Sequence, residues 1–460
     1  MTDETIAAIS TAYGEAGIGI IRISGEQAGF LLDQLFRPAS EGPVPTDCAR
    51  QLRYGTIIDP AIDQAVDEVL AVFMPAPATY TREDTAEIYC HGGLIPQRKI
   101  LELVCRAGAR PAEAGEFTRR AFMNGRIDLS QAEAVIDLIK AKTDESFSMA
   151  YDQMAGRLFQ KVQTVREQLM HVLVHLAASL DFSDEDIEFI SPTEIDCVLA
   201  EVIDQLEQLL ATAHTGRILR EGLKVAIAGR PNVGKSSLLN TLLRENRAIV
   251  TDIPGTTRDT IEEILDLGGL PICLIDTAGI RDTGDKIEKL GIEKSQAAFR
   301  GADLILFMVD GSQGLEPADL SIAWEIAAKA VIGLVNKTDL DQKIDLSKIN
   351  QILPTVEFLS VSLKENRGVD LLETAIRDFI YGGAVRTSVH PMVSNQRHIS
   401  LIEQAVEAAR QARLELANKQ TPDMIEVDIR ECWSKLGEIT GETVHEDIID
   451  EVFARFCLGK

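Results

Sequence analysis

The chain of 460 residues lacks the features that mark several broad classes of protein. Its seven cysteines are odd in number and never form a CxxC pair, which argues against a disulfide framework or a zinc site and favours a reducing compartment. The first ten residues, MTDETIAAIS, carry no basic segment and so do not resemble a signal peptide. No apolar run approaches the length needed to cross a bilayer. We therefore expect a cytoplasmic protein with no membrane partner.

Positive charge is also scarce, because 46 lysines and arginines stand against 72 acidic residues, for a formal net charge of −26. This balance argues against a broad basic surface that follows nucleic acid. Any contact with nucleic acid must then be local, or shared with a partner that supplies the positive charge. The chain also contains no internal repeat and no low-complexity tract.

The sequence pattern changes along the chain in a way that predicts several domains. Residues 1–120 mix short β-branched runs, at 17–24 and 69–75, with helical stretches and Gly/Pro breaks, as in an α+β domain. Residues 121–217 and 383–460 show helical periodicity. In residues 218–382 four buried strand-like runs alternate with helices, which is typical of a doubly wound α/β domain. The four runs are LKVAIAG, PICLIDT, ADLILFMVD and AVIGLVNK. We expect this α/β domain to be inserted into an α-helical bundle.

The most regular helical pattern lies between Leu158 and Leu176, where apolar residues recur at alternating spacings of four and three. This repeat spans nearly three heptads, which is short for a free coiled coil, so a helix of a bundle is the favoured interpretation. A second amphipathic helix is predicted at 193–213.

The stretch GRPNVGKS at 229–236 matches the GxxxxGK[ST] pattern between a predicted strand and an apolar helix. Its backbone N–H groups can surround phosphates at a helix N-terminus. Lys235 can neutralise the β- and γ-phosphates, and the Ser236 hydroxyl can bind Mg²⁺. The nucleotide-binding residues predicted here are Asn232, Val233, Gly234, Lys235, Ser236 and Ser237.

Further motifs follow in the order and at the spacing of a GTPase. In NKTD (336–339), Asp339 can accept hydrogen bonds from N1–H and the exocyclic amine of guanine, a pair that adenine does not offer. TDIPGTTRD (251–259) and DTAG (276–279) are the predicted switches, and SLK (362–364) is the predicted third base-contacting loop. The GTP-binding residues predicted in these motifs are Thr251, Asp252, Ile253, Pro254, Gly255, Thr256, Thr257, Asp276, Thr277, Ala278, Gly279, Asn336, Lys337, Thr338, Asp339, Ser362, Leu363 and Lys364.

The position after DTAG, where many small GTPases place a water-orienting glutamine, holds Ile280. An apolar side chain cannot orient the attacking water, so another residue must do so. The following segment offers four carboxylates, each of which from sequence alone is more often a solvated helix residue: Asp282, Asp285, Glu288 and Glu293.

These motifs, together with IGIIRISG near the N-terminus, AGEFTRRAFMNGRIDLSQAEAVIDLI at 114–139 and the terminal CLGK, resemble those of a known family. Over essentially its whole length the chain resembles MnmE (TrmE), the bacterial and organellar GTPases of tRNA wobble-uridine modification. It departs from the family pattern before IGIIRISG, where TAYGEAG replaces a PPG-type turn. The resemblance implies an N-terminal folate-binding and dimerisation domain, a helical domain and an inserted Ras-like G domain.

The resemblance also implies the cations and the catalytic residues of GTP hydrolysis. A K⁺ ion beside the phosphates would offset charge that develops in the transition state, as an arginine finger does, once two G domains face each other. The resemblance implies two catalytic residues for GTP hydrolysis. Glu288 would orient the attacking water, and Lys235 would neutralise the phosphates. The implied K⁺ ligands are Asn232, Thr251, Thr256 and the carbonyl of Ile253, and the implied Mg²⁺ ligands are Ser236 and Thr257.

A 5-formyl-tetrahydrofolate-type one-carbon donor is the further cofactor that the resemblance implies, at Arg22, Glu87, Arg126 and Lys460. A carboxylate can grip the adjacent N–H donors of a pterin, and Arg or Lys suits a glutamate tail. The terminal CLGK fails as a prenylation box. We expect the last helix to deliver Cys457 to the one-carbon site, as a candidate catalytic thiol, with a buried structural cysteine as the alternative.

The implied function is a GTP-hydrolysing enzyme that adds an aminomethyl or carboxymethylaminomethyl group to C5 of the wobble uridine (position 34) of certain tRNAs. A homodimer would assemble with the flavoprotein MnmG (GidA), as a heterotetramer or larger complex, and that partner would supply FAD and NADH. The alternative is a GTPase switch in ribosome assembly without modification chemistry. Such switches append basic RNA-binding modules, whereas this chain appends an acidic bundle that ends in Cys-x-Gly-Lys.

Overall fold

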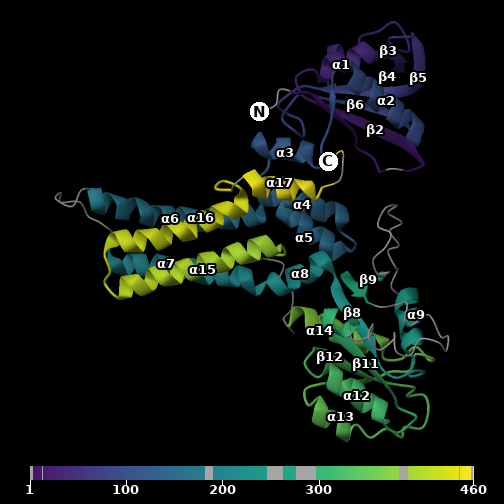
Figure 1. Cartoon of the computed structure of the whole chain (residues 1–460), viewed down its shortest axis with the longest axis vertical. Coiled ribbons are helices and arrows are strands. Elements are labelled where there is room, and N and C mark those ends of the chain that lie inside the picture. The colour runs from purple at the N-terminus through teal and green to yellow at the C-terminus, as the bar shows by residue number, and fades with distance from the viewer. Residues whose placement is uncertain are drawn as a thin grey trace. The chain divides into compact units, whose positions relative to one another are not determined.

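The structure is a computed structural model that describes residues 4–12, 14–181, 190–245, 263–275, 297–382, 392–444, 446–456 and 459. The chain divides into two compact units (Figure 1), one of Met1–Ile136 with Ser434–Lys460 and the other of Asp137–Trp433. In the described parts of the chain, no helix is both long and apolar enough to cross a membrane.

The first unit is built on a seven-stranded sheet in the order β3-β4-β5-β6-β2-β1-β7. The β1–β7 pair is parallel and the other pairs are antiparallel. This confirms the strands expected within residues 17–24 and 69–75. The strands are β1 (Ile6–Ile9), β2 (Ala16–Ser24), β3 (Phe36–Pro38), β4 (Arg53–Asp59), β5 (Gln64–Met74), β6 (Thr85–Gly92) and β7 (Arg110–Pro111).

The two faces of this sheet carry different side chains, because successive side chains of a strand point to opposite faces. Ile21 and Ile23 of β2 and Ile88 of β6 lie in the core that includes residues of α1 (Ala28–Leu35) and α2 (Leu94–Ala107). A short 3₁₀ helix, η1 (Pro45–Cys48), also packs against α1. The alternate positions of β2 and β6 therefore place Arg22 and Glu87 on the face opposite α1 and α2.

Helices α3 (Glu116–Met123), α4 (Leu129–Lys140) and α17 (Glu446–Ala454) complete the first unit. Phe453 of α17 is buried in one apolar cluster with Leu129 of α4. Beyond α17, the backbone of Gly459 closely approaches β1, since a Cβ there would lie 2.1 Å from the carbonyl oxygen of Ile9. The hydroxyl of Ser10 donates to the carbonyl of Gly459 at 3.2 Å. Gly459 is thus anchored at the end of β1.

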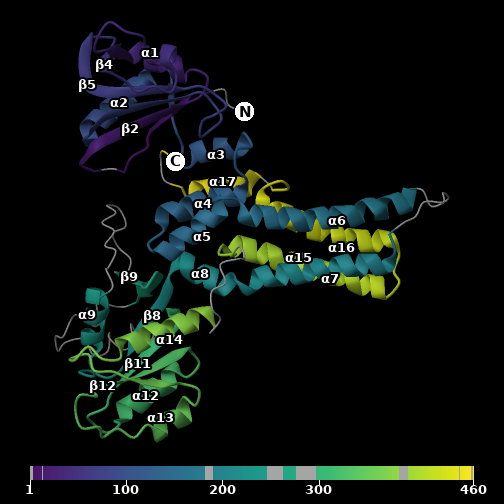
Figure 2. The ribbon, with the colours of Figure 1, turned by 180° about the vertical axis from the view of Figure 1, so that it is seen from behind.

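In the helical part of the second unit, the long helices α6, α7, α15 and α16 lie side by side in both views (Figures 1 and 2). All six apolar positions of the heptad-like pattern are buried in α6, which confirms the prediction of a bundle helix. The second predicted helix is confirmed as α7, which starts with a capping box at Ser191. The helices of this part are α5 (Asp144–Met154), α6 (Arg157–Asp181), α7 (Pro192–Ala211), α8 (Ala213–Glu221), α15 (Gln396–Ala417) and α16 (Pro422–Thr440).

The α/β part of the second unit is a six-stranded sheet in the order β13-β12-β11-β8-β10-β9. Neighbouring strands are parallel except β9 and β10, and the four buried runs expected from the sequence are confirmed as β8, β10, β11 and β12. The edge strands β9 and β13 lack a long apolar run and were not predicted. The strands are β8 (Leu223–Ala228), β9 (Glu263–Leu267), β10 (Leu270–Leu274), β11 (Leu304–Asp310), β12 (Val331–Asn336) and β13 (Phe358–Ser360).

Helices cover both faces of this sheet, as expected for a doubly wound fold. Residues of α9 (Lys235–Glu245) and α14 (Val369–Tyr381) share one apolar cluster with the strands. Residues of α12 (Pro317–Ile326) and α13 (Ser347–Ile352) share the other. This arrangement leaves the carboxyl ends of β8 and β12 at one edge of the sheet, where the loops that carry the nucleotide motifs begin.

A substitution in α6 tests the role of its buried stripe. Leu169→Ala removes a fully buried side chain, so we expect a loss of roughly 2–5 kcal/mol from the free energy of unfolding of the helical part. Thermal unfolding followed by circular dichroism measures this loss as a lower midpoint. The matched control is Met170→Ala, one residue along the same helix, whose side chain is 39% exposed. If Leu169→Ala and the control unfolded at the same midpoint temperature, the assignment of Leu169 to the buried core of the bundle would be contradicted.

Candidate functional site

The phosphate-binding motif forms a tight loop between the end of β8 and the start of α9 at Lys235. Three of its residues have positive φ angles, at +147° for Gly229, +68° for Asn232 and +115° for Gly234. Glycine adopts such angles without steric cost, and asparagine tolerates the left-handed region better than most residues. The sequence therefore supplies the residue types that the curvature of this loop requires.

Lys235 lies across the loop that precedes it. Its Nζ donates to the carbonyl oxygens of Gly229 at 2.6 Å and of Arg230 at 2.9 Å. Burial lowers the pKa of the Lys235 ammonium group. The first turn of α9, with Ser236 and Ser237, follows at once, so a cation and a helix N-terminus are found at the same place. Both features favour an anion such as a phosphate.

The side chain of Asn336 connects the phosphate-binding loop to the two loops, NKTD and SLK, that are expected to contact the guanine base. Asn336 is 4% exposed, and its Nδ2 donates to the carbonyl oxygen of Val233 at 2.8 Å. Its Oδ1 accepts from the backbone N–H of Leu363 at 3.4 Å. A Cβ on Gly234 would lie 2.2 Å from the same Nδ2, so only glycine fits beside the amide. One buried amide thus fixes three motifs relative to one another.

The residues of the NKTD motif are held in place by local contacts. The carboxylate of Asp339 accepts a hydrogen bond from the Ser362 hydroxyl at 2.8 Å, which orients it. Thr338 Oγ1 donates to the carbonyl oxygen of Val361 at 2.9 Å. The side chain of Lys364 is exposed in the adjoining loop. A carboxylate that is fixed before the ligand arrives loses less entropy when it binds guanine.

Lys337 has a left-handed backbone, with φ of +65°, and its Nζ lies 2.6 Å from Asp310 Oδ2 at the end of β11. Burial would raise the pKa of Asp310, but the hydrogen bonds from Lys337 and Ser312 outweigh it and the pKa is lowered. The ion pair is therefore charged near neutral pH, and it anchors the NKTD loop to the neighbouring strand.

The other carboxylates considered for the attacking water, Asp282, Asp285 and Glu293, lie outside the described residues. So do the remaining residues predicted for GTP, cations and catalysis and the two predicted site residues of the C-terminal motif. They are Thr251, Asp252, Ile253, Pro254, Gly255, Thr256, Thr257, Asp276, Thr277, Ala278, Gly279, Glu288, Cys457 and Lys460.

In the first unit, Arg22 and Glu87 are direct cross-strand partners on β2 and β6. Their side chains form an ion pair, with 2.8 Å between Nε and Oε1. The hydroxyl of Tyr89, two residues along β6, donates to the other carboxylate oxygen at 2.6 Å. Burial raises the pKa of Tyr89 to about 12, and its hydrogen bond to Glu87 adds to this effect. Tyr89 therefore remains a donor at neutral pH and helps to orient Glu87.

Arg126, in the segment after α3, lies close to the same aromatic ring as Arg22, the ring of Tyr80. Its guanidinium carbon lies 4.6 Å from the ring centroid of Tyr80, and its Nη1 donates to the Tyr80 carbonyl at 3.1 Å. The guanidinium of Arg22 lies 5.9 Å from the same centroid and 5.8 Å from that of Phe117. The structure thus brings two of the four residues predicted for folate, Arg22 and Arg126, to one ring, and a third, Glu87, is paired with Arg22. Tyr80 was missed because a single tyrosine in a polar loop has no spacing signal.

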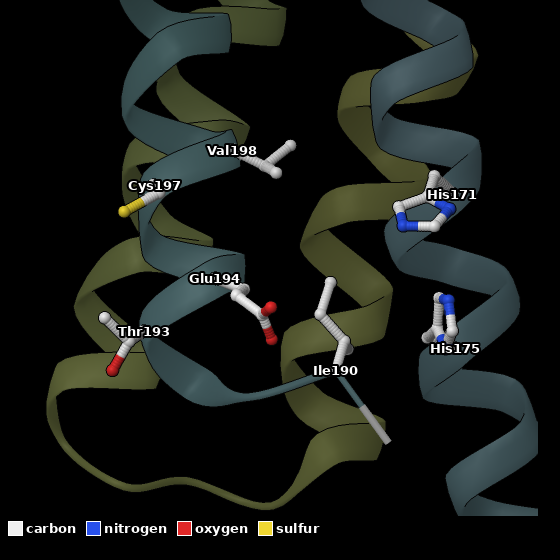
Figure 3. A pocket seen from close by; sticks show the side chains of 7 residues that line it. All are labelled: His171, His175, Ile190, Thr193, Glu194, Cys197 and Val198. Atoms are coloured by element: carbon white, nitrogen blue, oxygen red, sulfur yellow. The ribbon is translucent and has the colours of Figure 1, made fainter. Parts of the chain in front are cut away.

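A separate pocket of about 630 Å³ lies between α6 and α7 and contains none of the predicted site residues (Figure 3). Its lining includes His171 and His175, which follow one another at i and i+4, and Glu194. Figure 3 shows the sulfur of Cys197 pointing away from both histidines. Within the described ranges, no group of three or more His, Cys, Asp and Glu side chains could hold a metal ion.

Comparison with known proteins covers nearly the whole chain. Residues 5–126 match the family model described as GTP-binding protein TrmE N-terminus, and residues 129–457 match the MnmE helical domain. The tRNA modification GTPase MnmE of Alkaliphilus oremlandii is 50% identical over 458 residues, covering 100% of this chain and 99% of the relative. The protein of the same name from Geobacillus kaustophilus is 47% identical, covering 99% of each chain.

Solved structures overlap with a smaller part of the chain. The G domain of the T. maritima FeoB iron transporter is 26% identical and covers 34% of this chain and 98% of its own. The TM-score of this match is 0.26.

The fold and the P-loop, NKTD and SLK geometry define an inserted P-loop GTPase domain, and the expected fold class is confirmed. The chain belongs to the MnmE (TrmE) family of tRNA modification GTPases. The expectation of a GTP-hydrolysing enzyme that acts in tRNA modification is thereby confirmed.

Gly234→Ala tests the packing of the phosphate-binding loop against Asn336. Because the new methyl group would overlap with the Asn336 amide and Gly234 has a φ of +115°, we expect GDP affinity to fall by at least about 100-fold. Fluorescence titration with a labelled GDP measures this loss. The control is Gly314→Ala, at a glycine of the same domain where the new methyl group would have nothing within 4 Å. Near-native affinity of Gly234→Ala would refute the proposed packing constraint.

Proposed function

We propose that this enzyme couples a K⁺-dependent GTP cycle to one-carbon chemistry at C5 of the wobble uridine, position 34, of certain tRNAs. The observation that carries the proposal is the cluster of Arg22, Glu87 and Arg126 in the unit that lies outside the GTPase domain. A switch that acts in ribosome assembly without modification chemistry would have no use for such a second site. The modification hypothesis is therefore favoured over the switch.

The cluster suits a 5-formyl-tetrahydrofolate-type donor. Each carboxylate oxygen of Glu87 already accepts one hydrogen bond, from Arg22 and from Tyr89, and an ionised carboxylate oxygen can accept more than one. Glu87 can therefore accept the adjacent N–H groups of a pterin. The guanidinium of Arg126 can pair with a carboxylate of the glutamate tail. When bound, the donor would supply the one-carbon unit, and Lys460 and Cys457 complete the proposed site.

The proposed cation sites lie at the phosphate-binding loop. Asn232 has a left-handed backbone within that loop, and its amide oxygen is a suitable K⁺ ligand together with Thr251, Thr256 and the Ile253 carbonyl. Ser236 at the start of α9 and Thr257 would hold Mg²⁺. The roles proposed for hydrolysis are charge neutralisation by Lys235 and orientation of the attacking water by Glu288. The K⁺ site would be complete when two G domains face each other.

The proposed assembly is a cytoplasmic homodimer, formed through the N-terminal units, that works with the flavoprotein MnmG (GidA) in a heterotetramer or larger complex. The partner would bring FAD and use NADH, since the reaction needs a redox step that the groups named in this chain do not provide. The net charge of −26 supports a division of labour in which the partner makes much of the tRNA contact.

The rate of GTP hydrolysis in KCl and in NaCl at equal ionic strength tests the cation site, with ATP as the control nucleotide. We expect stimulation of at least about tenfold by K⁺, because an added cation at the phosphates acts as an arginine finger does. ATP should not be hydrolysed in either salt. Equal rates in the two salts would refute the K⁺ site and leave the GTPase assignment unchanged.

Replacing the terminal thiol separates modification from GTP hydrolysis. Cys457→Ser should leave the GTPase rate unchanged and abolish wobble-uridine modification, because serine is a far weaker nucleophile at neutral pH. Mass spectrometry of tRNA nucleosides, with the flavoprotein partner present, measures the modification. Cys432→Ser is the matched control, since Cys432 is buried in α16 and has a pKa raised to about 12 by burial. Retained modification by Cys457→Ser would exclude a catalytic thiol.

A further inference from the structure

We propose that Tyr80 is a positioning residue that holds both arginines of the one-carbon-donor site in their places, an inference that rests on the function proposed above. Two guanidinium groups from distant parts of the sequence lie over the ring of Tyr80. Arg126 stacks on it at 4.6 Å and Arg22 lies at 5.9 Å from its centroid. A cation within about 6 Å of an aromatic centroid is attracted by the ring quadrupole.

Arg22 and Arg126 differ in the contacts that hold them apart from the Tyr80 ring. Arg22 is held by Glu87 at 2.8 Å and by the ring of Phe117, which is fully buried. Arg126 is exposed, and its supports among the described residues are the Tyr80 ring and the Tyr80 carbonyl. Loss of the ring should therefore affect Arg126 more than Arg22.

Tyr80 can act as a fixed reference because its own loop is anchored on two sides. Its hydroxyl lies 2.9 Å from Thr118 Oγ1 on α3. The next residue, Thr81, pairs with the hydroxyl of Ser24 at 2.7 Å, and its carbonyl accepts from Asn124 Nδ2 at 2.6 Å. These contacts link the loop to β2, which carries Arg22, and to the end of α3, which precedes Arg126. The ring therefore cannot move without disturbing both elements.

A charged contact also fixes this loop. Glu83, three residues after Tyr80, pairs with Arg120 of α3 at 3.0 Å and accepts a hydrogen bond from Ser24 at 2.7 Å. Arg120 is 9% exposed, so this ion pair is shielded from water on one side. The loop therefore behaves as a rigid bridge between the sheet and α3.

The chemical consequence concerns the class of ligand that the site selects. Arg22 and Glu87 form the end of the cluster suited to a pterin, and Arg126 the end suited to a carboxylate tail. A fixed separation between the two ends favours a ligand that carries both groups over one that carries the pterin alone. Tyr80 thus contributes to selectivity for the glutamate tail without needing to touch the ligand itself.

The test compares the wild-type chain with Tyr80→Phe and Tyr80→Leu, with Phe30→Leu as the matched control. Phenylalanine keeps the ring face, whereas leucine removes it at similar bulk. Phe30 lies on α1, is 68% exposed, and its replacement makes the same aromatic-to-leucine change away from the cluster. Calorimetric titration measures the affinity of the full-length protein for two probes, 5-formyl-tetrahydrofolate and 5-formyl-6-methyl-tetrahydropterin, which carries the pterin without the benzoyl group, the glutamate or any carboxylate.

We expect Tyr80→Leu to weaken binding of 5-formyl-tetrahydrofolate by about tenfold, and Tyr80→Phe by no more than about threefold. The preference for the glutamate-containing probe should shrink in Tyr80→Leu and persist in Tyr80→Phe and Phe30→Leu. A purely structural role would lower the affinities for both probes equally and leave their ratio unchanged.

Three outcomes overturn the inference. An equal loss of affinity for both probes in Tyr80→Leu would show a purely structural role. If the wild-type chain binds the folate and Tyr80→Leu retains its affinity and probe ratio, Tyr80 has no positioning role and the proposed function stands. If the wild-type chain binds neither probe, the proposed one-carbon site fails, and the role of Tyr80 fails with it.

Discussion

The buried amide of Asn336 is the contact on which the nucleotide site depends. It accepts from the SLK loop and donates to the phosphate-binding loop, so it joins segments that are more than 100 residues apart in sequence. Each of those loops begins at the carboxyl end of a parallel strand, where the sheet itself keeps them close. The hydrogen bonds of the amide fix the two loops relative to each other. At position 234, glycine is the only residue type that leaves room for the amide.

In the first unit, the alternation of side chains along β2 and β6 determines which residues face the core and which face the candidate site. One set of alternate residues is apolar and packs with α1 and α2. The other set places Arg22 opposite Glu87, where the ion pair forms the base of the candidate site. The unit therefore stabilises its core and builds its candidate site with the same two strands.

Short motifs were predictable because their chemistry is local. The phosphate-binding loop, NKTD and the buried stripe of α6 each depend on residues within one or two turns of each other, so spacing alone identifies them. By contrast, β9 and β13 have short runs and become strands only through pairing at the edges of the sheet. Tyr80 and Tyr89 became visible as site residues only when the strands and the loop after β5 were placed in space.

The sequence by itself determined the GTPase motifs, the guanine preference expected from Asp339, the helical bundle and the resemblance to the MnmE family. The tertiary structure alone decided which groups meet in space: the Tyr80 ring with both arginines, the Tyr89 hydroxyl with Glu87, and the Gly459 carbonyl with the Ser10 hydroxyl at the end of β1. The physical reason is that motifs depend on separations along the chain, whereas ring stacking, ion pairs and close backbone approach depend on distances through space between segments that the sequence keeps far apart.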